Sequence, residues 1–385
     1  MLKNERIDIV KPYPYKMWVD NVKNLVDNIS DDEKQHWLSV NALLDDSLIM
    51  GPTNIFSFNV DIDFDADNLL MLSEDEYLAL AISRAYKKTY NRDIIFNRES
   101  YGRDDSVANL NRTVGWFTSQ YPVPVKVHNG YDDLSLISDV YSLKRAFKDV
   151  NNLGLNYASL IYTTEELEFK HCPVTFNFLS SEFVFKNDLF ESINQLSEND
   201  NNDEINIAEV ESESYGITFN ISRIGDSYII NGDYAQNTYL GDKFSVFLDN
   251  IKEELRFIAN YKFDNIVCCL SEPQLGIYLD ERVHDKDTAY SAAGIFECSS
   301  DYSVDELKDT IHALIEKHPI LKGRVLDTDD LPLLVCDSYP EISITNVDDY
   351  SNLIKPFDLD KSLARFFIVN NKYGMFIVYG IHHKQ

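Results

Sequence analysis

Hydrophobic positions near the start of the chain recur with a helical period and then change to the alternating period of a strand. Residues 14–29 space Trp18 and Leu25 for one buried helix face. A second helix is expected after Ser30, which precedes a run of acidic residues and is suited to cap a helix. Residues 55–62 then alternate apolar and polar side chains, which is typical of a half-buried strand.

Helical and strand patterns continue to alternate along the rest of the chain. Helical spacing predicts three further helices, at 74–90, 133–147 and 242–260. Short apolar or alternating runs predict strands at 93–96, 113–117, 159–162, 173–179, 215–223 and 227–234. The acidic segment 196–207 lacks the spaced glycine and terminal glutamate of a calcium loop, so its composition favours a mobile loop.

The segment 97–125 concentrates glycine, proline, aromatic and charged residues more densely than an ordinary core segment needs. A predicted strand leads into a polar turn that contains Glu99, Tyr101 and Arg103. Glu99 is therefore expected at a strand end, where loops place functional groups on a rigid scaffold. The competing interpretation is a surface ion pair between Glu99 and Arg98 or Arg103.

Composition limits the classes of partner. The 385 residues include 64 acidic and 35 basic side chains and give a formal net charge of -29. Such a surface repels a phosphate backbone, so nucleic acid is not an expected partner. The length suggests two or three folding units, and the hydrophobic content of 44% is sufficient for sizeable cores.

Neither a membrane span nor a secretory signal is evident, so the expected location is the cytoplasm. An odd number of cysteines without Cys-x-x-Cys spacing argues against a disulfide framework and a zinc site. We expect reduced, partly buried thiols at Cys172, Cys268, Cys269, Cys298 and Cys336.

Two motifs in the segment 97–125 resemble those of nonribosomal peptide synthetase epimerization domains. Residues 112–119, RTVGWFTS, match a family motif over eight consecutive positions. Residues 99–103, ESYGR, resemble the Glu-Gly-His-Gly-Arg motif, although Ser100 and Tyr101 replace Gly and His. Further resemblance to the C-terminal lobe of such a domain is found at 15–18, 33–37, 151–157 and 173–179.

After residue 260 the resemblance changes to the N-terminal lobe of a condensation domain. Residues 270–279 resemble its Leu-Ser-x-x-Gln-x-Gly-x-Tyr opening motif, and 307–325 resemble the helix that carries a His-x-x-Leu segment. Residues 356–359 match a Pro-Phe-Asp-Leu motif. A last strand at 373–381 leads to His382 and His383, which resemble the start of the His-His-x-x-x-Asp-Gly motif, and the sequence ends at Gln385.

The resemblance implies an α/β (α+β) fold of chloramphenicol-acetyltransferase-like lobes, with mixed sheets flanked by helices. Residues 1–260 are expected to form the C-terminal lobe of an epimerization-type domain, and 261–385 the N-terminal lobe of a condensation domain. The chain would then be a fragment of a synthetase, or its lobes would pair with each other or with another chain. We expect the isolated chain to be inactive.

The resemblance also assigns chemistry to particular residues. Glu99 corresponds to a carboxylate base for the α proton of a tethered residue, and His383 to the histidine that accepts a proton or orients the amine in condensation. For His383 the alternative is an exposed terminal histidine without a role. Further substrate or channel candidates are His382, Tyr101, Arg103, Trp116, Thr118, Ser119, Tyr157 and Asn177.

The implied substrates are aminoacyl or peptidyl thioesters carried on the phosphopantetheine of a carrier protein, and no metal or directly bound cofactor is expected. The implied partners are carrier protein domains and other synthetase modules. A non-catalytic carrier-protein docking or scaffold fragment is the alternative. An unrelated acyltransferase of the same fold fits less well, because it would keep the whole histidine motif and lack the motif at 112–119.

Overall fold

A computed structural model describes most of the 385-residue chain. The described residues are 12–62, 70, 72–103, 110, 112–148, 150, 154–179, 186–187, 190–191, 206–224, 227–262, 265–283, 288–299, 301–328, 332–350, 353 and 355–382. The chain divides into two compact units, which consist of 1–129 with 142–261 and of 130–141 with 262–385.

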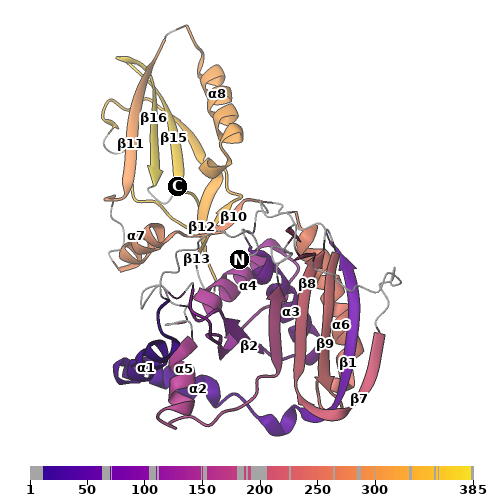
Figure 1. The fold of residues 1–385 in the computed structure, drawn as a ribbon. Coiled ribbons are helices and arrows are strands. Elements are labelled where there is room, and N and C mark those ends of the chain that lie inside the picture. The colour runs from indigo at the N-terminus through magenta and orange to yellow at the C-terminus, as the bar shows by residue number, and fades with distance from the viewer. Residues whose placement is uncertain are drawn as a thin grey trace. The chain divides into compact units, whose positions relative to one another are not determined.

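A seven-stranded sheet forms the centre of the first unit, with the strand order β3-β2-β4-β8-β9-β1-β7 (Figure 1). The pairs β2–β4 and β4–β8 are parallel, and the other neighbours are antiparallel. The strands are β1 (Met50–Asp61), β2 (Ile94–Ser100), β3 (Ser119–Val125), β4 (Val174–Leu179), β7 (Asn206–Tyr215), β8 (Ile217–Ile224) and β9 (Ser227–Ala235). A separate short pair consists of β5 (Lys186–Asn187) and β6 (Phe190–Glu191).

Helices cover one face of this sheet. Every second side chain of a strand points to the same face, and the aromatic side chains on this face pack against the helices. Phe56 of β1 packs against Phe244 of α6 with ring centroids 4.9 Å apart, and Phe219 of β8 lies 6.0 Å from Phe247. The helices that contribute to this unit are α1 (Tyr15–Leu25), α2 (Asp31–Asn41), α3 (Glu74–Tyr90), α4 (Asp133–Lys148), α5 (Leu155–Tyr162) and α6 (Phe244–Ala259). α4 also contributes its first residues to the second unit.

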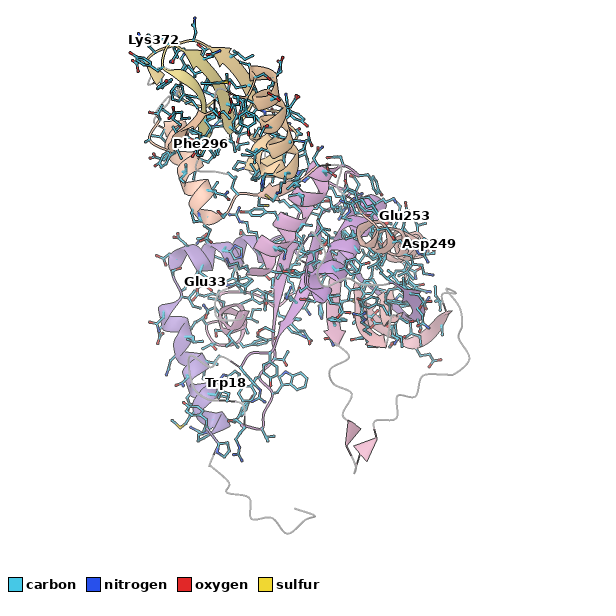
Figure 2. The ribbon with its side chains drawn as sticks, turned by 90° about the horizontal axis from the view of Figure 1, so that it is seen from above. Trp18, Glu33, Asp249, Glu253, Phe296 and Lys372 are labelled. Atoms are coloured by element: carbon cyan, nitrogen blue, oxygen red, sulfur yellow. The ribbon has the colours of Figure 1, made fainter. Side chains whose placement is uncertain are left out.

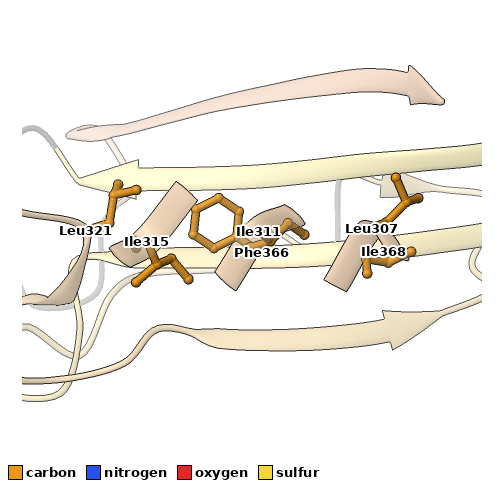
Figure 3. Close-up of a cluster of buried hydrophobic side chains, with 7 residues drawn as sticks. Leu307, Ile311, Ile315, Leu321, Phe366 and Ile368 are labelled. Atoms are coloured by element: carbon orange, nitrogen blue, oxygen red, sulfur yellow. The ribbon is translucent and has the colours of Figure 1, made fainter. Parts of the chain in front are cut away.

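The second unit contains a four-stranded sheet, β11-β16-β15-β14, and a three-stranded sheet, β10-β13-β12. α8 lies across one face of the four-stranded sheet, where Ile311 and Ile315 of the helix pack with Phe366 and Ile368 (Figure 3). The elements are β10 (Val267–Cys269), α7 (Glu272–Val283), β11 (Ser291–Cys298), α8 (Val304–Lys317), β12 (Gly323–Asp327), β13 (Pro332–Cys336), β14 (Glu341–Thr345), β15 (Ala364–Asn371) and β16 (Gly374–His382).

Three predicted elements differ from the structure. Residues 159–162 belong to the helix α5 and not to a strand, because they continue a helix whose Ser159 hydroxyl donates to the Leu155 carbonyl one turn earlier. The apolar run at 113–117 is irregular, and the strand begins at Ser119. The helix predicted at 307–325 ends at Lys317, and residues 323–327 form β12.

The remaining predicted elements are observed within a few residues of their expected bounds, and β2 extends through Glu99 to Ser100. The predicted acidic loop lies outside the described residues up to residue 205, and Asn206 begins β7. The α/β fold class with mixed sheets flanked by helices is confirmed. Within the described part of the chain, no helix is both long enough and apolar enough to cross a membrane.

Candidate functional site

Glu99 is the penultimate residue of β2, and it lies opposite Gln120 in the register between β2 and β3. The Gln120 side-chain Nε2 donates to Glu99 Oε1 at 2.6 Å. Because the donor is a neutral amide, this contact orients the carboxylate without neutralising its charge. Sequence reasoning missed Gln120, since only the strand register identifies it as the neighbour of Glu99.

The arginines next to Glu99 have other partners. Arg98 points to the opposite face of β2, where its guanidinium donates to Asp75 at 3.0 Å and stacks 3.6 Å from the Phe147 ring. Arg103 donates to two backbone carbonyls, at 2.5 and 2.9 Å, and lies 4.0 Å from the centre of the Phe117 ring. Among the described contacts, neither Arg98 nor Arg103 forms the ion pair with Glu99 that was the alternative to a functional role for this carboxylate.

The motif at 112–119 forms an anchored loop. Thr113 donates its hydroxyl to the Tyr13 carbonyl at 2.7 Å, and the Trp116 carbonyl accepts the Tyr15 hydroxyl at 2.7 Å. Gly102 has a φ of 66°, and a Cβ there would lie 1.8 Å from the Phe117 carbonyl oxygen, so the close approach requires glycine. Two candidate side chains of this region are nevertheless largely exposed, Tyr101 at 72% and Trp116 at 77%.

Polar side chains cover the sheet face on which Glu99 lies. Asn97, two residues before Glu99 on β2, donates to the Thr175 hydroxyl of β4 at 3.4 Å. Asn177 follows on the same face of β4 and lies opposite Asn220 of β8. Glu99 therefore shares its sheet face with the neutral polar side chains of Asn97, Thr175 and Asn177.

The other candidates of the first unit are less accessible. Thr118 is half-buried and Ser119 is buried. Tyr157 is 4% exposed, and its hydroxyl donates to Asn41 Oδ1 at 3.0 Å, while burial raises the pKa of its phenol above the ordinary value. Tyr157 thus has the contacts of a core residue.

In the second unit, His382 ends β16 and is 1% exposed. Its Nε2 lies 2.9 Å from Oε1 of Glu281 on α7, a partner that sequence reasoning did not identify. The Phe357 ring of the Pro-Phe-Asp-Leu motif lies 5.7 Å from the His382 ring. Two motifs distant in sequence therefore meet at the end of β16, while His383 lies outside the described residues.

The opening motif at 270–279 builds the start of α7 and its packing. Gln274 accepts hydrogen bonds from the backbone N–H and the hydroxyl of Ser271, and Tyr278 is buried with its hydroxyl bonded to Asp327. Burial and the bond to Asp327 raise the pKa of Tyr278 to about 12. Among the residues that the structure describes, no cluster of His, Cys, Asp and Glu could hold a metal ion.

Residues 77–261 match the family model named Condensation domain. The chain is 26% identical over 185 residues to a linear gramicidin synthase protein of Brevibacillus parabrevis, a match that covers 46% of this chain and 2% of that protein. It is 35% identical over 108 residues to surfactin synthase subunit 2 of Bacillus subtilis (strain 168), which covers 27% of this chain and 3% of that protein.

A solved structure of the epimerization domain from the third module of tyrocidine synthetase B is similar at 18% sequence identity, with a TM-score of 0.47. The match covers 67% of this chain and 62% of that chain. The sequence matches confirm the resemblance to condensation domains of peptide synthetases. The matched parts of this chain cover only 2% of the linear gramicidin synthase protein and 3% of surfactin synthase subunit 2.

Proposed function

We propose that residues 1–260 are the C-terminal lobe of an epimerization-type condensation domain, and that 261–385 are the N-terminal lobe of a following condensation domain. The chain would then act within a cytoplasmic peptide synthetase on aminoacyl or peptidyl thioesters bound to the phosphopantetheine of carrier proteins. The order of the motifs supports this division, and the family match at 77–261 lies in the first part.

The observation that carries the epimerization role is the environment of Glu99. Its carboxylate lies at a strand end beside a motif typical of epimerization domains, and Gln120 is its described hydrogen-bond partner. A thioester acidifies the α proton of the residue attached to it, so Glu99 can accept that proton. A protonated group on the opposite face, which the family resemblance assigns to a histidine of the other lobe, then donates a proton to the planar carbanion.

For condensation, the amine of one carrier-bound residue attacks the thioester of another, and a positioned histidine accepts a proton from that amine or orients it. We assign this role to His383. His382, its neighbour in the sequence, is held by Glu281 at 2.9 Å, which fixes the last residue of β16. His382 and Glu281 are therefore positioning residues in this proposal.

Residues 1–385 alone are expected to form neither D-residues nor dipeptides from carrier-bound thioesters, because each reaction needs groups from both lobes of one domain. Purified chain incubated with loaded carrier proteins, followed by chiral analysis and mass spectrometry of the released products, tests this. Product formation above that of a heat-denatured control would contradict the proposal of inactivity alone.

The role of Glu99 is tested after an epimerization-domain N-terminal lobe is supplied as a separate polypeptide. Glu99→Gln keeps the contact to Gln120 but cannot accept a proton, so exchange of the α proton with deuterated water should fall by about 10²–10⁴-fold. Glu168→Gln, which changes an exposed acid elsewhere in the first unit, is the matched control and should exchange normally.

A non-catalytic docking or scaffold role is the second candidate, and the replacement of the motif histidine by Tyr101 favours it. The Tyr101 ring is 72% exposed, and its described contact is with the Arg103 guanidinium, 5.3 Å from the ring centre. This role would be supported if the wild-type chain, mixed with the supplied N-terminal lobe, bound carrier protein but did not exchange the α proton. Equal exchange by wild type and a folded Glu99→Gln variant would remove Glu99 from the mechanism.

A further inference from the structure

β11 is an edge strand without the features that usually prevent an edge from pairing with another strand. Its neighbour in the four-stranded sheet is β16, and among the described residues no strand pairs with its other edge (Figure 1). One row of its backbone N–H and C=O groups is therefore available to another strand. The strand has eight residues, and its central side chains are exposed, with Ile295 at 51% and Phe296, labelled in Figure 2, at 60%.

Other sheet edges in the chain carry features that discourage pairing. β3 contains Pro122 and Pro124, which cannot donate to a ladder, and β7 carries the acidic side chains of Glu211 and Glu213. β14, the opposite edge of the same sheet as β11, has only five residues. β11 has no proline and no basic residue, and its one charged side chain is that of Glu297. A long, exposed, apolar edge of this kind favours association with another strand.

We propose that β11 pairs with β11 of a second copy of this chain, antiparallel about a two-fold axis at Gly294. This register places Ile295 opposite Ala293 and Phe296 opposite Ala292 of the other copy. Every large apolar side chain then faces a small one, which allows close cross-strand packing on both faces of the extended sheet. Because the axis lies near the middle of the strand, almost the whole length of both strands is paired.

Charge also favours a self-paired strand in this register. Glu297 faces Ser291, so the two acidic side chains do not oppose each other, and like charges directly opposite would be destabilising. The formal net charge of -29 acts against association of two copies at longer range. Salt screens this repulsion, so the proposal requires that dimerisation strengthen as ionic strength rises.

Sedimentation equilibrium of the full chain, with a monomer mass of 44.4 kDa, measures the association. Strand pairing covers less than the roughly 1,600 Å² of a standard interface, so we expect a dissociation constant of about 1–100 μM. In hydrogen exchange, the amides of β11 should become protected with increasing protein concentration. A chain that stays monomeric at about 1 mM in low and high salt overturns the proposal.

Two charge variants test the register itself. Ile295→Glu and Ala293→Lys change exposed side chains that lie on the sheet face opposite α8, so neither touches the apolar cluster between α8 and the sheet. Each variant alone should associate at least about 10-fold more weakly, because an edge charge opposes pairing. An equimolar mixture should form a heterodimer, since the lysine introduced in one copy would face the glutamate introduced in the other.

Ile344→Glu is the matched control, because Ile344 is 57% exposed on β14, the other edge strand of the same sheet. It should leave the dissociation constant unchanged. Association that Ile344→Glu weakens as much as Ile295→Glu does would assign the interface to a different edge. A mixture of the two β11 variants that associates no better than either alone would contradict the antiparallel register at Gly294.

Discussion

The ion pair between Arg84 of α3 and Glu254 of α6 is fully buried, with Nε and Oε2 2.8 Å apart. Glu254→Gln leaves the arginine charge without its counter-charge, so the free energy of unfolding of the first unit should fall by about 3–5 kcal/mol. Urea unfolding followed by tryptophan fluorescence measures this. The double variant Arg84→Met, Glu254→Leu should recover much of the loss, and an unchanged midpoint for Glu254→Gln would contradict the prediction.

Burial raises the pKa of the Cys172 thiol to about 12, from the ordinary value of 9.0. The thiol is therefore protonated at pH 8 in the folded chain, and the stability that this provides is complete below pH 9 and is lost as pH rises towards 12. N-ethylmaleimide at pH 8 should label the exposed Cys268 first and Cys172 only as the chain unfolds. Mass spectrometry of timed digests tests this, and labelling at equal rates would contradict it.

At the residue scale, the sequence locates Glu99 correctly at a strand end but does not identify its partner. Arg98 is adjacent in the chain, yet strand alternation directs it to the opposite face and towards Asp75. Gln120 is 21 positions away and becomes a neighbour only through the register of β2 with β3. The same limit applies to Glu281, which lies 101 positions from His382.

At the element scale, α8 begins with a capping box that decides where the helix starts. The Ser303 hydroxyl accepts the backbone N–H of Glu306, and the Glu306 carboxylate accepts the backbone N–H of Ser303 at 2.8 Å. These bonds lower the pKa of Glu306. Ser303→Ala should reduce the stability of the second unit by about 1 kcal/mol.

Circular dichroism during urea unfolding measures this effect, because the signal includes the helices and strands of the second unit. Ser343→Ala is the matched control, since the Ser343 hydroxyl donates to the side chain of Glu341 on the exposed strand β14 and caps no helix. If Ser303→Ala lowers the stability of the second unit no more than Ser343→Ala does, the capping box does not stabilise the start of α8.

The error at α5 shows why short apolar segments are the least predictable elements. Residues 159–162, SLIY, form a short segment in which three apolar residues follow a serine, and such a segment suits a strand or a helix equally well by period. Tertiary contacts decide the outcome, because Leu155, Leu160 and Ile161 are all buried when the segment is helical. The longer patterns of α3, α4 and α6 leave no such ambiguity, and their predicted bounds agree closely with the structure.

At the scale of the whole molecule, family motifs carry information that hydrophobic periodicity does not. The composition gives no sharp boundary near residue 260, whereas the change of motif identity there predicts one. In the structure, the chain passes between the two compact units at residues 129/130, 141/142 and 261/262. The assignment of residues 130–141 to the second unit was not predictable, because the helical pattern of α4 continues unbroken through residue 141.

The three tryptophans, Trp18, Trp37 and Trp116, all belong to the first unit, so their fluorescence reports on that unit alone. Each unit has its own buried core, and we therefore expect two unfolding transitions. Circular dichroism should report both transitions, and tryptophan fluorescence should report only that of the first unit. Leu255→Ala in α6 and Ile315→Ala in α8 each remove a fully buried side chain and should cost about 2–5 kcal/mol.

Only Leu255→Ala should move the fluorescence midpoint, whereas Ile315→Ala should move a transition seen by circular dichroism and leave fluorescence unchanged. The two variants act as controls for each other, because both leave a cavity in a buried core by truncating an aliphatic side chain to alanine. If Ile315→Ala lowers the fluorescence midpoint as much as Leu255→Ala does, the units unfold as one cooperative body. Separate transitions would instead agree with two lobes that belong to successive domains of a synthetase, since each lobe would then hold its fold through its own core.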